Sequence, residues 1–213
     1  MNFCLASTSP ARLALLRSAG IEPVLHAPDV DETAVADAAA QAAGAPLHPR
    51  EVVQLLAQAK AEAVASGPAR DLDGLILGGD SVFVLDGIVY GKPHTAERAK
   101  ERWLAQRGHT GSLYSGHWLI EQRGGVSVRA VGAWAVAEVT FAADITDGEL
   151  DAYIATGEPL FVAGAFTIDS LGAPFISGIV GDPSTVVGLS LPTLRTLVRE
   201  LGHEWTSLWN RDA

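Results

Sequence analysis

The sequence predicts an α/β or α+β fold built on a mixed β-sheet flanked by helices. Short apolar runs end in turn residues, amphipathic helical patterns separate those runs, and two long strand patterns, 113–121 and 126–141, meet at Gly124-Gly125. Helices that alternate with strands are typical of a sheet covered by helices. With 213 residues, the chain fits one large domain or a two-lobed single domain.

The expected helices begin and end at recognisable capping residues. Ser9 followed by Pro10 is a strong start signal, because a serine oxygen accepts free helix N–H groups and proline suits the first helical position. Thr146 and Glu149 have the spacing of a capping box, and Gly202 suits a helix end. With the apolar periodicity, such signals predict helices over 10–19, 49–66, 95–106, 146–155 and 191–201.

The expected strands are apolar runs bounded by glycine or acidic turn residues. They span 3–6, 21–27, 75–77, 82–85, 88–90, 113–121, 126–141 and about 174–180. An acidic loop, 29–32, follows the second of them. The alanine-rich stretch 33–46 contains Gly44 and Pro46 and fits a helix or a mobile surface loop equally well. Near the C-terminus, Trp205 and Trp209 are expected to pack or to form an interface rather than to carry chemistry.

The stretch 72–93 is the most informative part of the chain. Its apolar strand is expected to stop at Gly78-Gly79-Asp80-Ser81, to resume, and to return through a two-residue hairpin at Asp86-Gly87. Such a hairpin would place Asp80 and Lys92 near each other at one sheet edge, where the glycines let a ligand approach closely. Taken alone, these residues fit an ordinary turn and loop better than a ligand site.

Composition excludes several classes of protein. Hydrophobic residues make up 48% of the chain and charged residues 19%, which is typical of a compact soluble protein and not of a disordered one. No apolar run approaches the roughly 20 residues that span a bilayer, and the N-terminus does not resemble a signal peptide. The net charge of −10 argues against non-specific nucleic-acid binding. Cys4 is the only cysteine, which fits a reducing cytoplasm.

The first candidate site is Ser7-Thr8-Ser9-Pro10-Ala11-Arg12. A hydroxyl-rich turn at the start of a helix presents free N–H groups and the positive end of the helix dipole, and together these attract an anion. Arg12 in the first helical turn could bind a phosphate with two nitrogens. The alternative is a capped helix with a surface arginine, and the motif alone favours that alternative.

Two further signals are weak when taken separately. The acidic pair Asp31-Glu32 could ligate a hard cation such as Mg²⁺, although acidic loops are usually only solvated. The chain has three lysines, Lys60, Lys92 and Lys100, against 12 arginines, and a lysine is a compact point charge suited to phosphate. Lys60 lies near the end of its expected helix, where a lysine more often interacts with the helix dipole.

The order of these motifs along the chain resembles the Maf family. These are nucleoside triphosphate pyrophosphatases, also described as septum-formation inhibitors. The motifs are Ser-x-Ser-x-x-Arg at 7–12, Asp-Glu at 31–32, Leu-Ala-x-x-Lys-Ala at 56–61, Gly-Gly-Asp-Ser at 78–81, Gly-Lys-Pro at 91–93, Ala-Gly-Ala-Phe at 163–166 and Gly-Asp-Pro-Ser-Thr-Val-Val-Gly-Leu-Ser-Leu-Pro at 181–192. The resemblance implies that 1–213 is a single elongated α/β domain of two lobes around a central cleft, like inosine-triphosphatase-type enzymes.

The resemblance also implies an activity: cleavage of a nucleoside triphosphate to the monophosphate and pyrophosphate with a divalent cation, Mg²⁺, Mn²⁺ or Co²⁺. Asp80 matches the family's catalytic aspartate, as water-activating base, metal ligand or both, and Glu32 matches the acidic residue near the metal. The positions that match phosphate-binding residues are Ser7, Ser9, Arg12, Lys60 and Lys92. An ionised aspartate, a metal and cations around a triphosphate are what attack of water on the α-phosphorus requires.

Three positions depart from the family pattern. Gly111 stands where histidine is common, and Val162 and Asp169 replace lysine and glutamine. Base preference is therefore open between pyrimidine triphosphates such as dTTP and UTP, slightly favoured, and 7-methylguanosine triphosphate. The alternatives are an inosine-triphosphatase-like purine pyrophosphatase and a weakly catalytic nucleotide-binding regulator of cell division.

The expected enzyme is cytoplasmic, binds neither nucleic acid nor membrane, and could form a homodimer.

Overall fold

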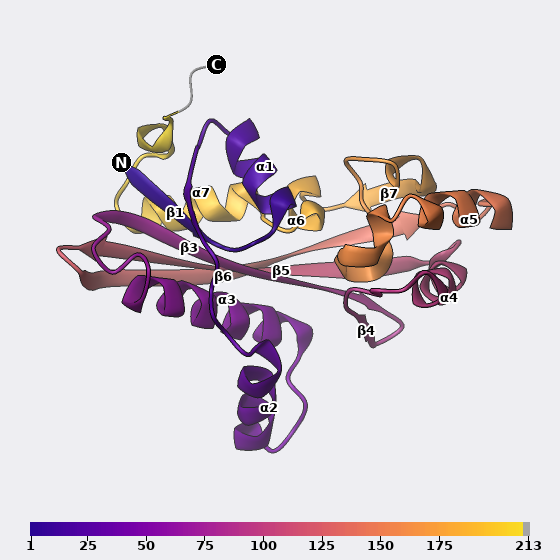
Figure 1. Ribbon diagram of the computed structural model, residues 1–213, viewed down its shortest axis with the longest axis horizontal. Coiled ribbons are helices and arrows are strands. Elements are labelled where there is room, and N and C mark those ends of the chain that lie inside the picture. Colours follow the sequence, from indigo (N-terminus) through magenta and orange to yellow (C-terminus); the bar gives the residue numbers. More distant parts are fainter. Residues whose placement is uncertain (211–213) are drawn as a thin grey trace. The chain divides into compact units, whose positions relative to one another are not determined.

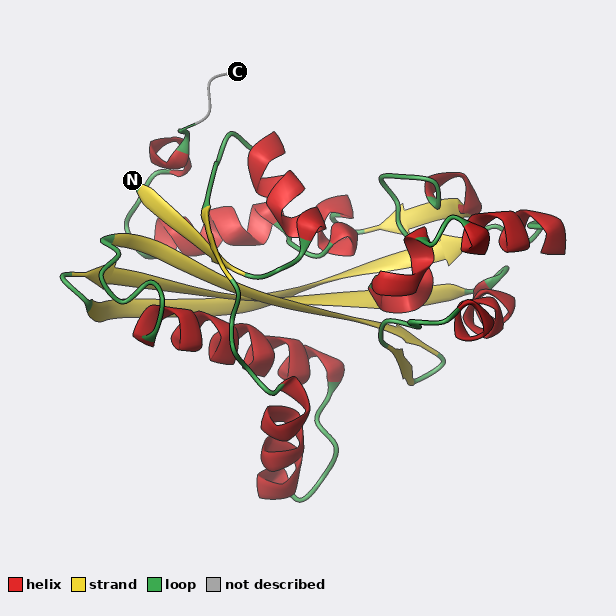
Figure 2. Ribbon diagram, in the orientation of Figure 1, coloured by secondary structure: helices red, strands yellow, loops and turns green. Residues whose placement is uncertain are grey.

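The computed structural model describes residues 1–210 and contains one mixed β-sheet, whose strands and neighbouring helices are drawn in Figures 1 and 2. The strand order is β2-β1-β3-β5-β6-β7, and β4 pairs with β3. β1 is parallel to β2 and β3, whereas β3–β4 and β6–β7 are antiparallel. The strands are β1 (Asn2–Ala6), β2 (Val24–His26), β3 (Gly74–Leu85), β4 (Ile88–Tyr90), β5 (Thr110–Arg123), β6 (Val126–Phe141) and β7 (Ile176–Val180). The predicted α/β class with a mixed sheet is confirmed.

The helices match most of the sequence predictions. They are α1 (Pro10–Ser18), α2 (Glu32–Ala43), α3 (Pro49–Ser66), α4 (Ala96–Gln106), α5 (Asp147–Ala155), α6 (Pro183–Val187) and α7 (Leu191–Glu200), with short 3₁₀ turns at Glu158–Phe161, Ala163–Ala165, Ala173–Phe175 and Trp205–Leu208. The Ser9 oxygen caps α1 as expected, and Thr146 and Glu149 form the expected capping box of α5. Among residues 1–210, every helix is too short or too polar to span a bilayer.

The chain divides into two compact units. The first comprises Met1–Asp80, Ser115–Ala135 and Gly188–Ala213, of which the last three residues lie outside the described part, and the second comprises Ser81–Tyr114 and Val136–Val187. In the first unit, alternate residues of β1 enter two different cores. Phe3 and Leu5 pack with α1 and α7, while Cys4 and Ala6 pack with α3. A strand buried on both faces explains the unbroken apolar run of the N-terminus.

The second unit has an aromatic core. Trp103, Phe141 and Phe166 meet Phe83 and Tyr153 in mostly edge-to-face contacts, a favourable arrangement for aromatic rings. The Trp103 indole donates a hydrogen bond to the carbonyl oxygen of Ala165 at 2.7 Å. The core therefore anchors the segment around Ala163–Ala165.

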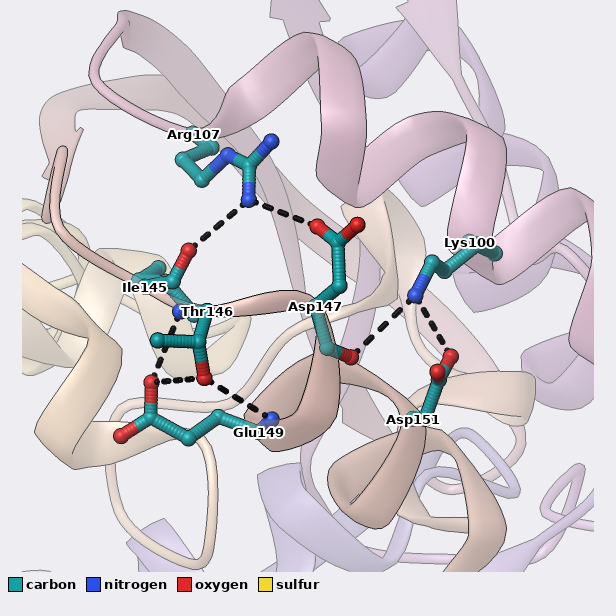
Figure 3. Close-up of polar contacts among 7 residues, drawn as sticks. All are labelled: Lys100, Arg107, Ile145, Thr146, Asp147, Glu149 and Asp151. Carbon is teal, nitrogen blue, oxygen red and sulfur yellow. Dashed lines mark hydrogen bonds and ion pairs between the residues drawn. The ribbon is translucent and has the colours of Figure 1, made fainter.

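Polar contacts join α4 to the start of α5 (Figure 3). Lys100 forms an ion pair with Asp151 and donates to the carbonyl oxygen of Asp147. Arg107 donates to the Ile145 carbonyl oxygen at 2.8 Å and pairs with the Asp147 carboxylate at 2.9 Å. Lys100, the third lysine, thus has a structural role in the second unit.

The predicted break in the strand at 78–81 is wrong, because β3 continues through these residues. The glycines serve close packing instead. A Cβ atom at Gly78 would lie 2.0 Å from the Ala57 carbonyl oxygen of α3, so only glycine lets helix and strand approach this closely. In the strand order β3 lies between β1 and β5, but β1 pairs with it only as far as Gly78 and β4 only from Phe83, so Asp80 lies between these two pairings and its expected place at a sheet edge stays a prediction.

Three further predictions concern turns and ends. The hairpin at Asp86-Gly87 is confirmed, with both residues at positive φ and Leu85 paired with Ile88. The predicted acidic loop is confirmed for residues 29–31, and its last residue, Glu32, begins α2, which resolves the 33–46 alternative in favour of a helix. Asp31 Oδ1 caps this helix by accepting a hydrogen bond from the Ala34 amide at 3.0 Å. Trp209 packs against Gly20, where a Cβ atom would approach its indole to 2.9 Å.

Candidate functional site

The turn between β1 and α1 contains two of the expected hydroxyl groups. Ser9 accepts the Arg12 amide at the helix N-terminus, and Ser7 Oγ accepts the Ser9 amide at 3.1 Å. Ser7 Oγ also accepts Nη1 of the Arg12 side chain at 3.2 Å. The hydroxyl groups of this turn therefore orient both the helix start and the guanidinium.

Arg12 is a buried side chain, so the alternative of a surface arginine is wrong. Its Nε donates to the carbonyl oxygen of Gly188 at 2.8 Å. Burial lowers the pKa of the Arg12 guanidinium, while the negative charges of Asp80 and Glu32 raise it. The guanidinium is thus fixed by backbone and hydroxyl acceptors and faces two carboxylates.

Lys60 joins the two acidic residues predicted for the site. Its Nζ lies 2.7 Å from Asp80 Oδ1 and 2.8 Å from Glu32 Oε1. Lys60 and Asp80 are each 7% exposed, whereas the Glu32 side chain is 53% exposed. Lys60 is followed by six more residues of α3, and its ammonium binds carboxylates, so the helix-dipole interpretation of this lysine is wrong.

The pKa of Asp80 is shifted by burial and by three charged neighbours. Burial raises the pKa of the Asp80 carboxyl above its usual range, and the nearby Glu32 charge raises it further. Lys60 and Arg12 oppose this shift, because two positive charges favour the ionised form. Burial makes the Asp80 carboxylate a stronger proton acceptor than a solvated one, and the neighbouring cations favour its ionised form.

Glu32 and Asp80 are also the residues that could hold a divalent cation. Within residues 1–210, no group of three or more His, Cys, Asp or Glu side chains converges on one point. Mg²⁺ is often held by one or two carboxylates, with water or substrate oxygens as its other ligands, so this pair fits such an ion.

The structure brings together all the predicted site residues of the first unit: Ser7, Ser9, Arg12, Glu32, Lys60 and Asp80. Lys92 follows β4 in the second unit, and its role stays a prediction. Sequence reasoning missed the Gly188 carbonyl, which binds Arg12, because a backbone acceptor 176 residues away has no local signature.

The fold is that of an α/β protein with a mixed sheet. Its polar site contains the cations Arg12 and Lys60 and the carboxylate of Asp80. Arg12 follows the carboxyl end of the parallel strand β1, and such strand ends are a usual position for ligand sites in α/β sheets. The family model described as "Maf-like protein" matches residues 2–201. The chain therefore belongs to the Maf family.

Full-length relatives carry one name. Proteins of Leifsonia xyli subsp. xyli (66% identity, 99% of this chain and 98% of the relative), Corynebacterium diphtheriae (46%, 100% of both) and Rhodococcus opacus (46%, 98% and 96%) are each named nucleoside triphosphate pyrophosphatase. Among solved structures, the Staphylococcus aureus Ham1 protein aligns over 67% of this chain and 73% of its own, at 10% identity and a TM-score of 0.36.

Proposed function

We propose that this chain is a nucleoside triphosphate pyrophosphatase that releases pyrophosphate from pyrimidine triphosphates such as dTTP and UTP. Membership of the Maf family and the common name of the relatives support the reaction. The buried Lys60–Asp80 pair beside Arg12 is the observation that supports this reaction at particular residues. It combines a proton acceptor with two fixed cations.

Asp80 acts in this proposal as the base for the attacking water. Its raised pKa gives the carboxylate a greater proton affinity, while Lys60 keeps it ionised and oriented. Burial favours the neutral carboxyl that proton transfer leaves, whereas the charges of Lys60 and Arg12 favour the ionised form before transfer. Asp80 can therefore accept the proton at the moment when the oxygen attacks phosphorus.

Arg12, Ser7 and Ser9 bind the phosphates. The guanidinium carries positive charge and the N-terminus of α1 offers N–H donors, and hydrogen bonds to Gly188 and Ser7 orient the guanidinium. Donors fixed in advance stabilise charge that develops on phosphate oxygens without reorganising during the reaction. Lys92 supplies a further cation to the phosphates; the family resemblance alone supports this role.

A divalent cation, Mg²⁺, Mn²⁺ or Co²⁺, would be held by Glu32 and Asp80 and would neutralise phosphate charge when bound. The exposed Glu32 contributes a solvent-accessible oxygen ligand, while the buried Asp80 contributes the fixed one. Because Lys60 contacts both carboxylates, it limits the negative charge between them in the free enzyme.

The proposed preference for pyrimidines rests on the sequence Gly164-Ala165-Phe166-Thr167-Ile168-Asp169, which resembles the family members that act on pyrimidine triphosphates. The core of the second unit fixes this segment through the bonds that Trp103 and Gln106 donate to the carbonyl oxygens of Ala165 and Gly164. A rigid segment suits recognition of one base type. We place the activity in the cytoplasm, where nucleotide pools would be cleared of surplus and non-standard members.

The test is pyrophosphate release from about a dozen canonical and modified triphosphates with each of the three metals. We expect the highest kcat/KM for dTTP, UTP or their modified relatives. A preference for ITP or XTP would identify a purine pyrophosphatase instead. A preference for 7-methylguanosine triphosphate would rule out the proposed specificity for pyrimidines. Tight nucleotide binding without turnover would identify a regulatory protein instead.

A further inference from the structure

His117 is a fully buried polar residue of β5 whose two ring nitrogens both have partners. Nδ1 lies 3.2 Å from the Ala133 carbonyl oxygen, and Nε2 lies 2.8 Å from the Ser190 amide nitrogen. A carbonyl only accepts and an amide only donates, so Nδ1 carries the proton and Nε2 the lone pair. The partners thus assign one neutral tautomer to this imidazole.

Ser190 belongs to a short segment that leads back to Arg12. Ser190 begins α7 as its capping residue, and the side chain of the preceding Leu189 is buried in the core of the first unit. Gly188, which precedes Leu189, has a φ of 116°, a conformation that favours glycine. Its carbonyl oxygen accepts the hydrogen bond from Arg12 Nε. The position of this carbonyl therefore depends on how the Gly188–Ser190 segment is held.

The backbone around His117 is itself fixed. Gln54 of α3 donates to the His117 carbonyl oxygen at 3.0 Å, and a Cβ atom at Gly116 would lie 2.2 Å from the Val53 carbonyl oxygen. The imidazole therefore extends from a part of β5 that packs closely against α3. Its Nε2 atom is an acceptor at a defined position for the Ser190 amide.

We propose that His117 is a positioning residue for phosphate binding: through Ser190 and the Gly188 carbonyl it holds the Arg12 guanidinium in its binding orientation. The inference rests on the proposed function, since it assumes that Arg12 binds the triphosphate. His117 contacts no substrate in this scheme. It acts only by fixing the segment to which Arg12 is bonded.

Two substitutions at this position separate the two hydrogen bonds. In His117→Asn, the amide nitrogen can replace Nδ1 towards Ala133, but no atom reaches Ser190. In His117→Gln, the longer side chain can bring its oxygen to the Ser190 amide, the position of Nε2. We expect about a tenfold rise in KM for the nucleotide in H117N with a smaller change in kcat, and recovery to within about threefold in H117Q, because small misplacements of positioning groups are costly.

A double-mutant cycle with Arg12→Ala tests whether His117 acts through Arg12. R12A should weaken binding more strongly than H117N, and the double variant should be no worse than R12A within about twofold. Gly188→Ala, which strains the segment from its other end, should show the same lack of additivity. Leu208→Ala, in the same core but with a side chain that takes no part in these hydrogen bonds, is the stability control: it should lower Tm without changing KM.

The cycle is measured twice, by pyrophosphate release and by calorimetric binding of inorganic tripolyphosphate. An unchanged KM in folded H117N, or multiplicative losses in both H117N/R12A and G188A/R12A, would overturn the inference; if H117N does not fold, the G188A cycle decides alone. If the wild-type protein cleaves no nucleotide but the binding cycle is non-additive, the proposed function fails and the positioning role stands. If the wild-type protein does not bind tripolyphosphate, both fail.

Discussion

Replacement of Lys60 by methionine is expected to destabilise the protein strongly, and more so at higher pH. The variant keeps the length of the side chain but leaves the buried Asp80 without its closest cation. At 2.7 Å and an effective dielectric constant of about 20, the attraction lost is about 6 kcal/mol. Part of it was offset by desolvation of the pair, so breaking the pair should cost about 3–5 kcal/mol. The exposed Glu32 adds little to this figure.

The sign of the pH dependence follows from Asp80. Its pKa in the folded protein is raised by burial, and loss of Lys60 removes an opposing influence, so the folded variant favours a protonated Asp80. A carboxyl with a raised folded pKa contributes stability that is complete below its unfolded pKa, near 4, and is lost as the pH rises through the folded value. The difference between K60M and wild type should therefore be smaller at pH 5 than at pH 8.

Urea unfolding followed by circular dichroism at both pH values measures this difference. The matched control is the double variant Lys60→Met/Asp80→Asn, which removes both charges and should recover much of the lost stability, because no uncompensated charge is buried. A loss below about 1 kcal/mol, or one that is equal at pH 5 and pH 8, would refute the assignment of Lys60–Asp80 as a buried ion pair.

Three further outcomes are expected. Asp80→Asn should lower kcat for pyrophosphate release about 10²–10⁴-fold, while calorimetry should still detect nucleotide binding; unchanged turnover would remove Asp80 from the mechanism. Gly78→Ala should destabilise by about 1–3 kcal/mol in urea melts because its Cβ meets the α3 backbone, whereas Gly148→Ala, with open space around its Cβ, should not. EDTA should abolish pyrophosphate release and added Mg²⁺ should restore it. The Glu32→Gln variant should need several-fold more Mg²⁺ than wild type, whereas the exposed control Glu62→Gln should not. Equal Mg²⁺ requirements in wild type and Glu32→Gln would exclude Glu32 as a ligand.

Local signals predicted most of the helices correctly. Ser9-Pro10 and the Thr146–Glu149 capping box act within four residues, so their meaning does not depend on the rest of the fold. The same holds for the Asp86-Gly87 hairpin, whose positive φ angles these two residue types tolerate.

The errors arose where a residue's role depends on a distant partner. Gly78 resembles a strand break in sequence, but it is a contact point for α3 within a continuous strand. Asp31-Glu32 resembles a solvated loop, but Asp31 caps α2 and Glu32 reaches Lys60. In both cases the surrounding elements, not the local composition, decide the structure.

Capping residues, apolar periodicity and the order of short motifs predicted a mixed sheet flanked by helices, the order of its elements and the residue types of the candidate site, because these signals act within short segments of chain. The buried Lys60–Asp80 pair and the bond from Arg12 to the Gly188 carbonyl could not be predicted in this way, since each joins residues that are distant in sequence. The physical reason is that a charge acquires its pKa, and a guanidinium its orientation, from burial and from acceptors that folding brings in from distant parts of the chain.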